Sequence, residues 1–275
     1  MNTIDDFGRQ WQIHGHIDDD YWCNVDVLRD YVGPLLDLND VEGTATAEVG
    51  SGSGRIIRML NECKPASLHA IEPSVGVEVL RRNTLDIPNL EIHHRRGDDF
   101  DISGLDFIFS LGVIQFIQNP LPTLINIRNN LSNTGKFVIW VYGKENNGLY
   151  LAFFRSVHLI TRRLNDRILD YVSAGLNYLL LPYIFLCRFL PLPMREYVRE
   201  VFAKCGMQKR KYIIFDQLNP TFAKYYTRDE LVDLLTAAGF HNIETHHRHG
   251  YSWTAVCSKN QDDLLIPGPQ PSSPG

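Results

Sequence analysis

The segment Gly50-Ser-Gly-Ser-Gly54 places three glycines in five residues, directly after an apolar run and directly before an amphipathic stretch that begins at Arg55. Glycine lets the backbone turn tightly and approach a ligand that a Cβ atom would exclude. A helix that begins at Arg55 would offer unpaired N–H groups to the same ligand. The segment therefore predicts a strand, a ligand-binding turn and a helix, a unit typical of α/β folds.

The rest of residues 44–143 repeats this alternation. Apolar runs typical of strands occupy 44–49, 68–71, 90–93, 105–110 and 137–142, and helical patterns occupy 55–62, 74–83 and 123–131. Strands that alternate with helices imply right-handed crossovers and a parallel, doubly wound sheet. Ligands bind at the carboxyl edge of such sheets, so we expect the glycine turn and the residues after the other strands to form one site.

The alternation stops after residue 143 and resumes near Thr227, which begins a capping box with Glu230. The helix that follows should end at Gly239, and a hairpin of strands 243–248 and 251–258 should complete the sheet. We therefore predict the following segments: an N-terminal helical lid segment at 1–43, a core at 44–143 and 224–260, a helical insertion or cap at 144–223, and a disordered tail rich in Pro and Ser at 261–275.

The chemistry of the turn favours a cationic nucleotide ligand. In the dinucleotide-binding pattern G-x-G-x-x-G the third glycine comes one residue later than Gly54 does. Glu48, two residues before the first glycine, would repel a pyrophosphate but would suit a ligand that carries ammonium and sulfonium charges.

Several motifs together resemble class I methyltransferases that use S-adenosylmethionine. Residues 48–54 resemble the first motif of that group, and Glu72-Pro73-Ser74 resembles the second, whose acidic residue holds the ribose hydroxyls. Gly97-Asp98-Asp99 resembles the loop in which an Asp accepts from the adenine amino group. Residues 106–114 resemble the strand whose end lines the methyl-donor site, and 226–240 resemble the last helix and its Ala-Gly-Phe ending.

The resemblance implies a Rossmann-like, doubly wound, mainly parallel seven-stranded sheet with an antiparallel last strand, plus the helical cap. It also implies S-adenosylmethionine as the cofactor. The residues expected to bind it are Glu48, Gly50, Ser51, Gly52, Gly54, Glu72, Pro73, Asp98, Asp99, Ser110, Leu111 and Gly112.

Methyl transfer is an in-line displacement that depends mainly on holding the nucleophile close to the methyl group and aligned with it, so a dedicated base is optional. His247 and His249, near the end of strand 243–248, are the candidate catalytic bases; the alternative is a polar hairpin tip with solvated imidazoles. Gln115, Tyr142 and Tyr251 are the candidate substrate contacts. No metal is expected at 246–249, because adjacent strand residues point to opposite faces.

The insertion differs from the core in charge and hydropathy. Residues 144–222 carry 12 Lys/Arg and 6 Asp/Glu, within a chain whose net charge is −5. The strongly apolar stretch 176–190 is short for a membrane span. Three interpretations stay open: a cap over the active site, a homodimer interface or core, and a surface that makes peripheral contact with a membrane.

The remaining features exclude some functions. The acidic net charge argues against a nucleic-acid partner. Five scattered cysteines and an N-terminus without a signal-peptide pattern predict a cytoplasmic protein with free thiols. We expect methyl transfer to a small-molecule acceptor, hydrophobic or anionic, with oxygen as the favoured atom. The alternative is a non-catalytic regulatory protein that binds S-adenosylmethionine or S-adenosylhomocysteine.

Overall fold

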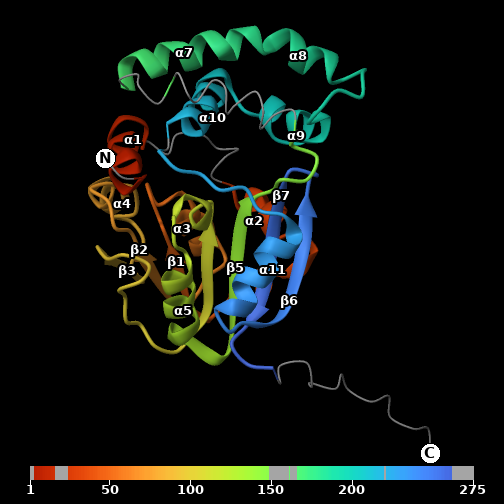
Figure 1. Ribbon diagram of the computed structural model, residues 1–275. Helices are drawn as coiled ribbons and strands as arrows, with labels where there is room; N and C mark the ends of the chain where they lie inside the picture. Colours follow the sequence, from red (N-terminus) through yellow and green to blue (C-terminus); the bar gives the residue numbers. More distant parts are fainter. Residues whose placement is uncertain (1–2, 16–23, 149–160, 162–165, 220, 262–275) are drawn as a thin grey trace, which may run out of the picture.

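The computed structural model describes residues 3–15, 24–148, 161, 166–219 and 221–261. Its centre is a seven-stranded sheet with the strand order β3-β2-β1-β4-β5-β7-β6 (Figure 1). The strands are β1 (Ala45–Val49), β2 (Ser67–Ile71), β3 (Leu90–His93), β4 (Leu105–Leu111), β5 (Leu131–Tyr142), β6 (His241–Arg248) and β7 (Ser252–Ser258). The first five are parallel, and β7 runs antiparallel between β5 and β6. The predicted fold class is confirmed.

Helices cover both faces of the sheet. They are α2 (Val25–Val32), α3 (Arg55–Glu62), α4 (Val77–Asn83), α5 (Leu121–Asn130) and α11 (Arg228–Ala237), whereas α1 (Thr3–His14) lies above the strand ends. Helices α2, α3 and α4 contribute Leu28, Ile57 and Leu80 to the apolar core on one face. On the other face, α5 and α11 contribute Leu124 and Leu235. Both faces are buried because strands such as β4 are apolar along almost their whole length.

The sequence located most of these elements. Helix α3 has the predicted bounds, and α11 begins with the predicted capping box, in which Thr227 and Glu230 each bind the other's backbone N–H. The helix predicted at 74–83 begins later, at Val77, because Ser74 and Gly76 form a turn in which the Ser74 hydroxyl accepts from the Gly76 N–H. Gly239 follows α11 with φ +85°, as its predicted capping role requires.

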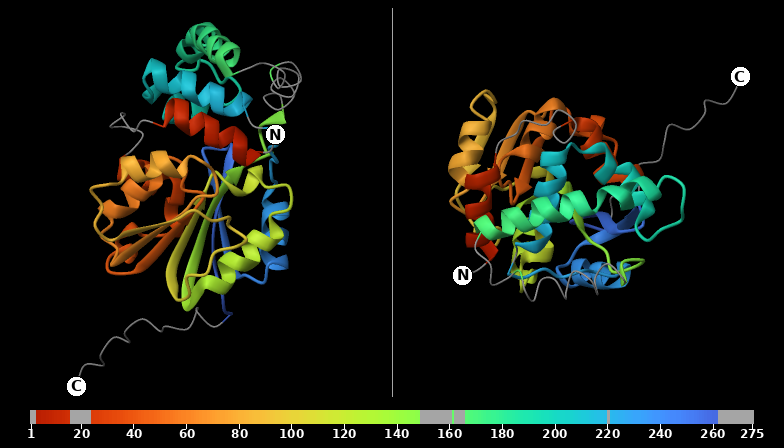
Figure 2. Two further views of the ribbon diagram at one scale, coloured as in Figure 1. Left: turned by 90° about the vertical axis from the view of Figure 1, so that its left-hand side faces the viewer. Right: turned by 90° about the horizontal axis from the view of Figure 1, so that it is seen from above.

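The described part of the insertion forms a separate helical layer above the carboxyl ends of the strands (Figure 2). It consists of α7 (Asp166–Leu179), α8 (Leu181–Leu186), α9 (Arg195–Glu200) and α10 (Met207–Leu218). These helices share an apolar cluster of their own, built on Leu169, Ile184, Val198 and Phe215. Helix α10 is the part of this layer that lies nearest to α1 and the sheet.

Two of the predicted segments lie partly outside the described residues. The predicted disordered tail lies outside them from residue 262 onward, and so does part of the insertion, 149–160 and 162–165. The described cysteines, Cys63, Cys187, Cys205 and Cys257, are all free.

Candidate functional site

A cavity of about 590 Å³ lies between the carboxyl edge of the sheet and the helical layer, within the range of small-molecule sites. Its floor comes from the glycine loop and the ends of β4 and β5, and its upper wall comes from α10. Among its lining residues are Trp11, Glu48, Gly50, Ser51, Gly52, Arg55, Leu111, Gly112, Tyr142, Tyr212, Asp216, Gln217 and Tyr251.

The glycine loop has the backbone shape that its sequence predicted. Gly50, Gly52 and Gly54 have φ angles of +84°, +53° and +90°, which L side chains rarely adopt. The N–H groups of Gly50 and Ser51 donate to the carbonyl of Ile71 at 2.7 and 3.1 Å, so the end of β2 supports the turn. A Cβ atom on Gly50 would come within 2.4 Å of the Val113 side chain. The loop is therefore closely packed against the segment that follows β4, and both line the cavity.

Glu48 presents a buried carboxylate to the cavity. It lines the cavity at 1% exposure, and its Oε2 atom has no hydrogen-bond partner among the described residues. Burial raises the pKa of this carboxyl to about 8, against the opposing charge of Arg55 and a hydrogen bond from Ser51. A buried polar atom without a partner is costly, which favours a cationic ligand group at this point.

Glu72 is held rigidly at the end of β2. Its two carboxylate oxygens accept from the N–H groups of Gly52 at 2.8 Å and Ser74 at 2.9 Å. The side chain lines a smaller cavity of about 110 Å³ that shares Trp11 and Gly52 with the larger one. Glu48 and Glu72 therefore bracket the glycine loop from two neighbouring strands.

Helix α1 lies over the loop, between the sheet and α10 (Figure 2). Its Trp11 ring is the nearest group to the α-carbons of Gly52 and Gly76 in the direction of a Cβ atom. Its Phe7 ring meets Phe116 edge to face at 4.7 Å. These contacts place α1 against the glycine loop, and a lid function for the N-terminal segment stays a prediction.

Several residues predicted to bind the cofactor lie outside both cavities. Asp98 forms a paired ion contact with Arg96 at 2.9 and 3.0 Å, which lowers the pKa of the Asp98 carboxyl. Asp99 is exposed and lies 3.6 Å from Arg95. The Ser110 hydroxyl is buried and donates to the Val49 carbonyl at 3.2 Å. Gly54 and Pro73 are also outside both linings, while Leu111 and Gly112 belong to the lining of the larger cavity.

The upper wall carries a polar network that sequence reasoning missed. The Gln10 side chain of α1 donates to Asp216 at 2.7 Å and to the Tyr212 hydroxyl at 3.0 Å, both on α10. Burial raises the pKa of the Asp216 carboxyl, opposed by the Gln10 hydrogen bond and by the charges of Lys209 and Arg55. Tyr212 and Asp216 are spaced i, i+4 on one helical face. The sequence shows that these two side chains share a face of the helix, but it does not show that this face lies over the cavity.

The predicted substrate residues lie in or beside the cavity. Tyr142 lines it and accepts at its hydroxyl from Gln217 at 2.7 Å. Tyr251 lines it too, and burial raises the pKa of its phenol to about 12. Gln115 is fully buried outside the lining, and neither polar atom of its amide has a partner among the described residues.

The two imidazoles proposed as bases lie outside the cavity lining. The carboxyl end of β6 does reach this edge of the sheet, since β6 runs parallel to β5. His249, however, turns its Nε2 toward Asp30 at 2.7 Å, and His247 stacks on Trp253 with ring centroids 4.2 Å apart. Together with Arg248, which also pairs with Asp30, His249 fastens the hairpin to α2. Their positions do not serve an acceptor in the cavity.

Comparison with known proteins finds similarity in structure but not in sequence. No family model matches the sequence, and no curated protein matches it. The chain is similar to a putative methyltransferase of Haloferax volcanii, solved in complex with the activator Trm112, at a TM-score of 0.55 and 16% identity, covering 93% of this chain and 98% of that one.

Two further structures give the same picture. An S-adenosylmethionine-dependent methyltransferase from Aquifex aeolicus matches with a TM-score of 0.51 and 14% identity, covering 91% of this chain and 97% of that one. The pyocyanin biosynthetic protein PhzM matches with a TM-score of 0.52 and 15% identity, covering 84% of this chain and 54% of that one. The chain therefore has the Rossmann-like fold of class I methyltransferases.

Proposed function

We propose that this chain is an S-adenosylmethionine-dependent methyltransferase that methylates an oxygen atom of a small-molecule acceptor. The observation that carries the proposal is Glu48, a buried carboxylate oxygen without a partner beside a loop of three positive-φ glycines. A fold of this kind hosts many functions, so the argument rests on the site rather than on the likeness.

The residues present fit this cofactor. Glu48 would pair with the ammonium group of its methionine part, which supplies the partner that the buried carboxylate lacks. Glu72, already oriented by two backbone N–H groups, would accept from the ribose hydroxyls. Gly50 and Gly52 leave room for close approach, and Leu111 and Gly112 line the same space at the end of β4.

When bound, the cofactor supplies a methyl group activated by the positive sulfur. The chain must hold the acceptor oxygen near that carbon, exclude water and receive the acceptor's proton. Tyr142, Gln217 and Tyr212 offer hydrogen-bonding groups on the acceptor side of the cavity. Helix α1 and the helical layer lie above the carboxyl ends of the strands, and Trp11 and Tyr212 from them line the cavity.

Asp216 takes the role of base that the sequence had suggested for His247 or His249. It lines the cavity, whereas the imidazoles do not. Its raised pKa makes the ionised carboxylate a better proton acceptor than an ordinary Asp. Gln10 holds its orientation by direct hydrogen bonding.

The alternative, a regulatory protein that binds the cofactor without transferring methyl, shares the cofactor half of the site. Calorimetry with S-adenosylmethionine tests this shared half. Glu72→Ala should weaken cofactor binding at least tenfold. If the wild-type protein binds no S-adenosylmethionine, both proposed functions are wrong. Product formation across a panel of hydroxylated acceptors then separates them. Binding without transfer to any acceptor would favour the regulatory function.

The acceptor is proposed to be hydrophobic and presented at a membrane surface. Among the described residues, one stretch, Arg167–Leu186, is long and apolar enough to cross a membrane, longer than the sequence had suggested because α7 and α8 are nearly continuous. It has a buried polar side, however. Asp170 pairs with Lys211 of α10 at 2.7 Å, and Asn177 donates to the Met207 carbonyl at 2.8 Å. A helix fastened in this way lies on a membrane rather than across it.

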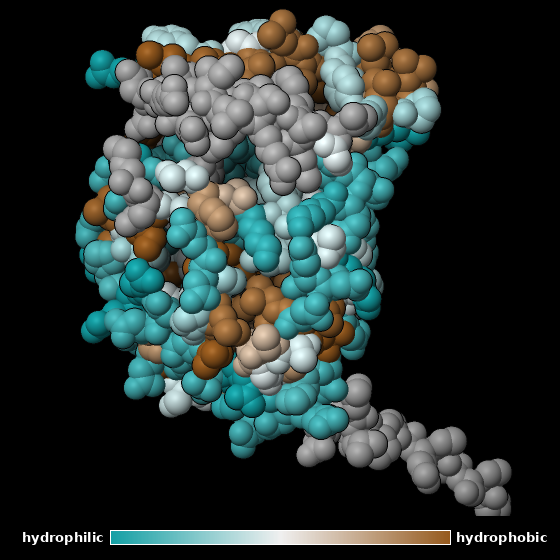
Figure 3. Space-filling model, in the orientation of Figure 1, coloured by the Kyte–Doolittle hydropathy of each residue, from teal (hydrophilic) through white to brown (hydrophobic). Residues whose placement is uncertain are grey.

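The opposite side of these helices is an exposed apolar face (Figure 3). Its side chains include Tyr171, Tyr178, Leu179, Phe185 and Phe189, which are 58–78% exposed. The exposed Arg167 precedes this set of side chains along the sequence and the exposed Arg188 lies near its end, which suits anionic lipid headgroups. We propose a cytoplasmic protein that docks through this face.

Sedimentation with vesicles tests the docking. Full-length protein should bind vesicles that contain anionic phosphatidylglycerol, and Leu179→Ser/Phe185→Ser/Phe189→Ser should abolish binding while cofactor affinity stays unchanged. The exposed Leu85→Ser on the core serves as a matched control. A dimer in light scattering that dissociates in the triple variant, without vesicle binding by the wild type, would instead assign the face to a second copy of the chain.

A further inference from the structure

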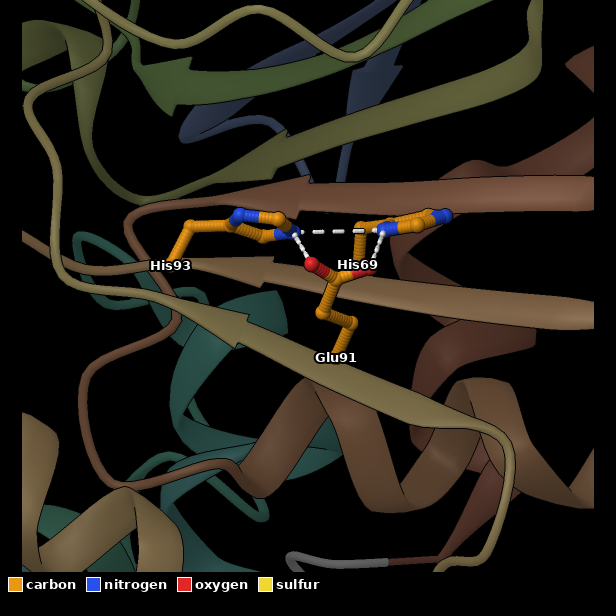
Figure 4. Close-up of side chains that lie close together, drawn as sticks. All are labelled: His69, Glu91 and His93. Atoms are coloured by element: carbon orange, nitrogen blue, oxygen red, sulfur yellow. Dashed lines mark hydrogen bonds and ion pairs between the residues drawn. The ribbon is translucent and has the colours of Figure 1, made fainter.

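Three metal-ligating side chains meet at the outer edge of the sheet, away from the cavity (Figure 4). Strand β3 is an edge strand that pairs with β2, and the register places Glu91 of β3 opposite His69 of β2. His93 follows Glu91 by two residues, so all three side chains lie on the same face of the sheet. This face is opposite to the one on which Leu68 and Ala70 join the core.

The donor atoms converge on one point. His69 Nδ1 lies 3.3 Å from His93 Nε2 and 3.6 Å from one Glu91 carboxylate oxygen, while His93 Nε2 lies 3.7 Å from the other. Tetrahedral zinc has nitrogen and oxygen ligands at 2.0–2.2 Å, which places the ligand atoms about 3.4 Å apart. The observed separations match this spacing with small side-chain adjustments.

The donor set also selects the kind of ion. Two imidazole nitrogens and one carboxylate oxygen suit Zn²⁺ and related transition metals, whereas Mg²⁺ prefers a shell of oxygens. The His69 and His93 side chains are 15% and 20% exposed, and that of Glu91 is 67% exposed. The imidazoles are thus partly fixed by packing, while Glu91 leaves the ion a path from solvent.

We propose that His69, Glu91 and His93 form a Zn²⁺ site that clips β3 to β2, with water completing the coordination. No part of the proposed methyl transfer requires this ion, because none of its ligands lines the cavity. The clip fixes the strand that leads into the turn at 94–99, next to the end of β2 that carries Glu72.

Calorimetry with ZnCl₂ on full-length protein, made without a histidine tag and stripped with a chelator, tests the site. We expect one ion per chain, and an unfolding midpoint raised by about 5 °C at a hundredfold excess over Kd. Co²⁺ should give the visible absorption of a tetrahedral site, and Mg²⁺ should not compete. His93→Gln and Glu91→Gln should each weaken Zn²⁺ binding at least tenfold.

His94→Gln is the matched control, since His94 follows His93 directly but bonds to the Pro73 carbonyl instead. It should bind Zn²⁺ like the wild type. Wild-type protein that binds no Zn²⁺, or His93→Gln and Glu91→Gln variants that bind it as tightly as the wild type, would overturn the proposal. A folded far-UV spectrum for each variant separates lost ligands from lost structure.

Discussion

The indole ring of Trp11 lies directly over the α-carbon of Gly52, so that a Cβ atom there would come within 2.8 Å of the ring. Helix α1 and the glycine loop are therefore fitted to each other at this position. Gly52 also has a φ of +53°, which adds a backbone requirement to the steric one.

Gly52→Ala should destabilise the protein by about 2–4 kcal/mol, because left-handed backbone strain and overpacking against Trp11 add together. Chemical denaturation measures this change. Gly104→Ala is the matched control, since Gly104 has a φ of +84° but nothing within 4 Å of its virtual Cβ atom. It should lose only the backbone part. Trp11→Ala combined with Gly52→Ala should recover the steric part, and strictly additive losses would argue against the contact.

The affinity for S-adenosylmethionine should rise with pH up to about 8. Below that value the Glu48 carboxyl, whose pKa is raised to about 8, must release a proton before it can pair with a cation. One linked proton gives at most about a tenfold gain per pH unit. Calorimetry in buffers of different ionisation enthalpy measures the proton release directly.

Glu48→Gln should bind more weakly at pH 8 and lose this pH dependence, whereas the exposed Glu42→Gln should behave as the wild type. An unchanged pH slope in Glu48→Gln would assign the linked proton to another group.

The same substitution should stabilise the ligand-free protein at high pH. The folded-state pKa of Glu48 is raised from 4.5 to about 8, so the bound proton favours the fold below pH 4.5 and this contribution is lost as the pH rises toward 8. Glu48→Gln carries no titrating group there. Its unfolding free energy relative to wild type should therefore increase by a few kcal/mol between pH 5 and pH 8.5, at about 1.4 kcal/mol per pKa unit. Groups common to both proteins cancel in this difference, and a constant difference would contradict the buried charge.

Asp216→Asn should lower kcat by about 10²–10⁴-fold with an acceptor hydroxyl, while the Kd for S-adenosylmethionine changes little. The amide keeps the size of the side chain and its contact with Gln10, but it cannot take a proton. Asp229→Asn is the control, since the Asp229 side chain of α11 is exposed. If His249→Gln loses more activity than Asp216→Asn, the imidazole held by Asp30 is the base after all.

The part of the site that is local in sequence could be predicted, and the part that depends on tertiary packing could not. Glu48, Gly50 and Gly52 are adjacent, so their backbone shape and chemistry follow from a short segment. Asp98 was assigned by its place after β3, but the neighbouring Arg96 holds its carboxylate outside the cavities.

Asp216 and Gln10 illustrate what sequence reasoning lacks. They are 206 residues apart, and only the docking of α10 on α1 brings them together. His69 and Glu91 meet for a similar reason, through the register of two parallel strands. Neither contact could be predicted from a repeating pattern in the sequence, because each depends on how separate elements pack against one another.

The helical layer over the cavity has its own apolar interior, centred on Phe215 and Ile184, which is separate from the two cores that flank the sheet. A change of α10 side chains on the side that faces this interior is therefore accommodated within the layer. On the cavity side, Tyr212 and Asp216 bind Gln10 of α1, whose neighbour Trp11 covers Gly52, so a change there reaches the glycine loop. If the proposed function holds, this layer could be remodelled for a different acceptor without loss of cofactor binding as long as its contact with α1 is kept.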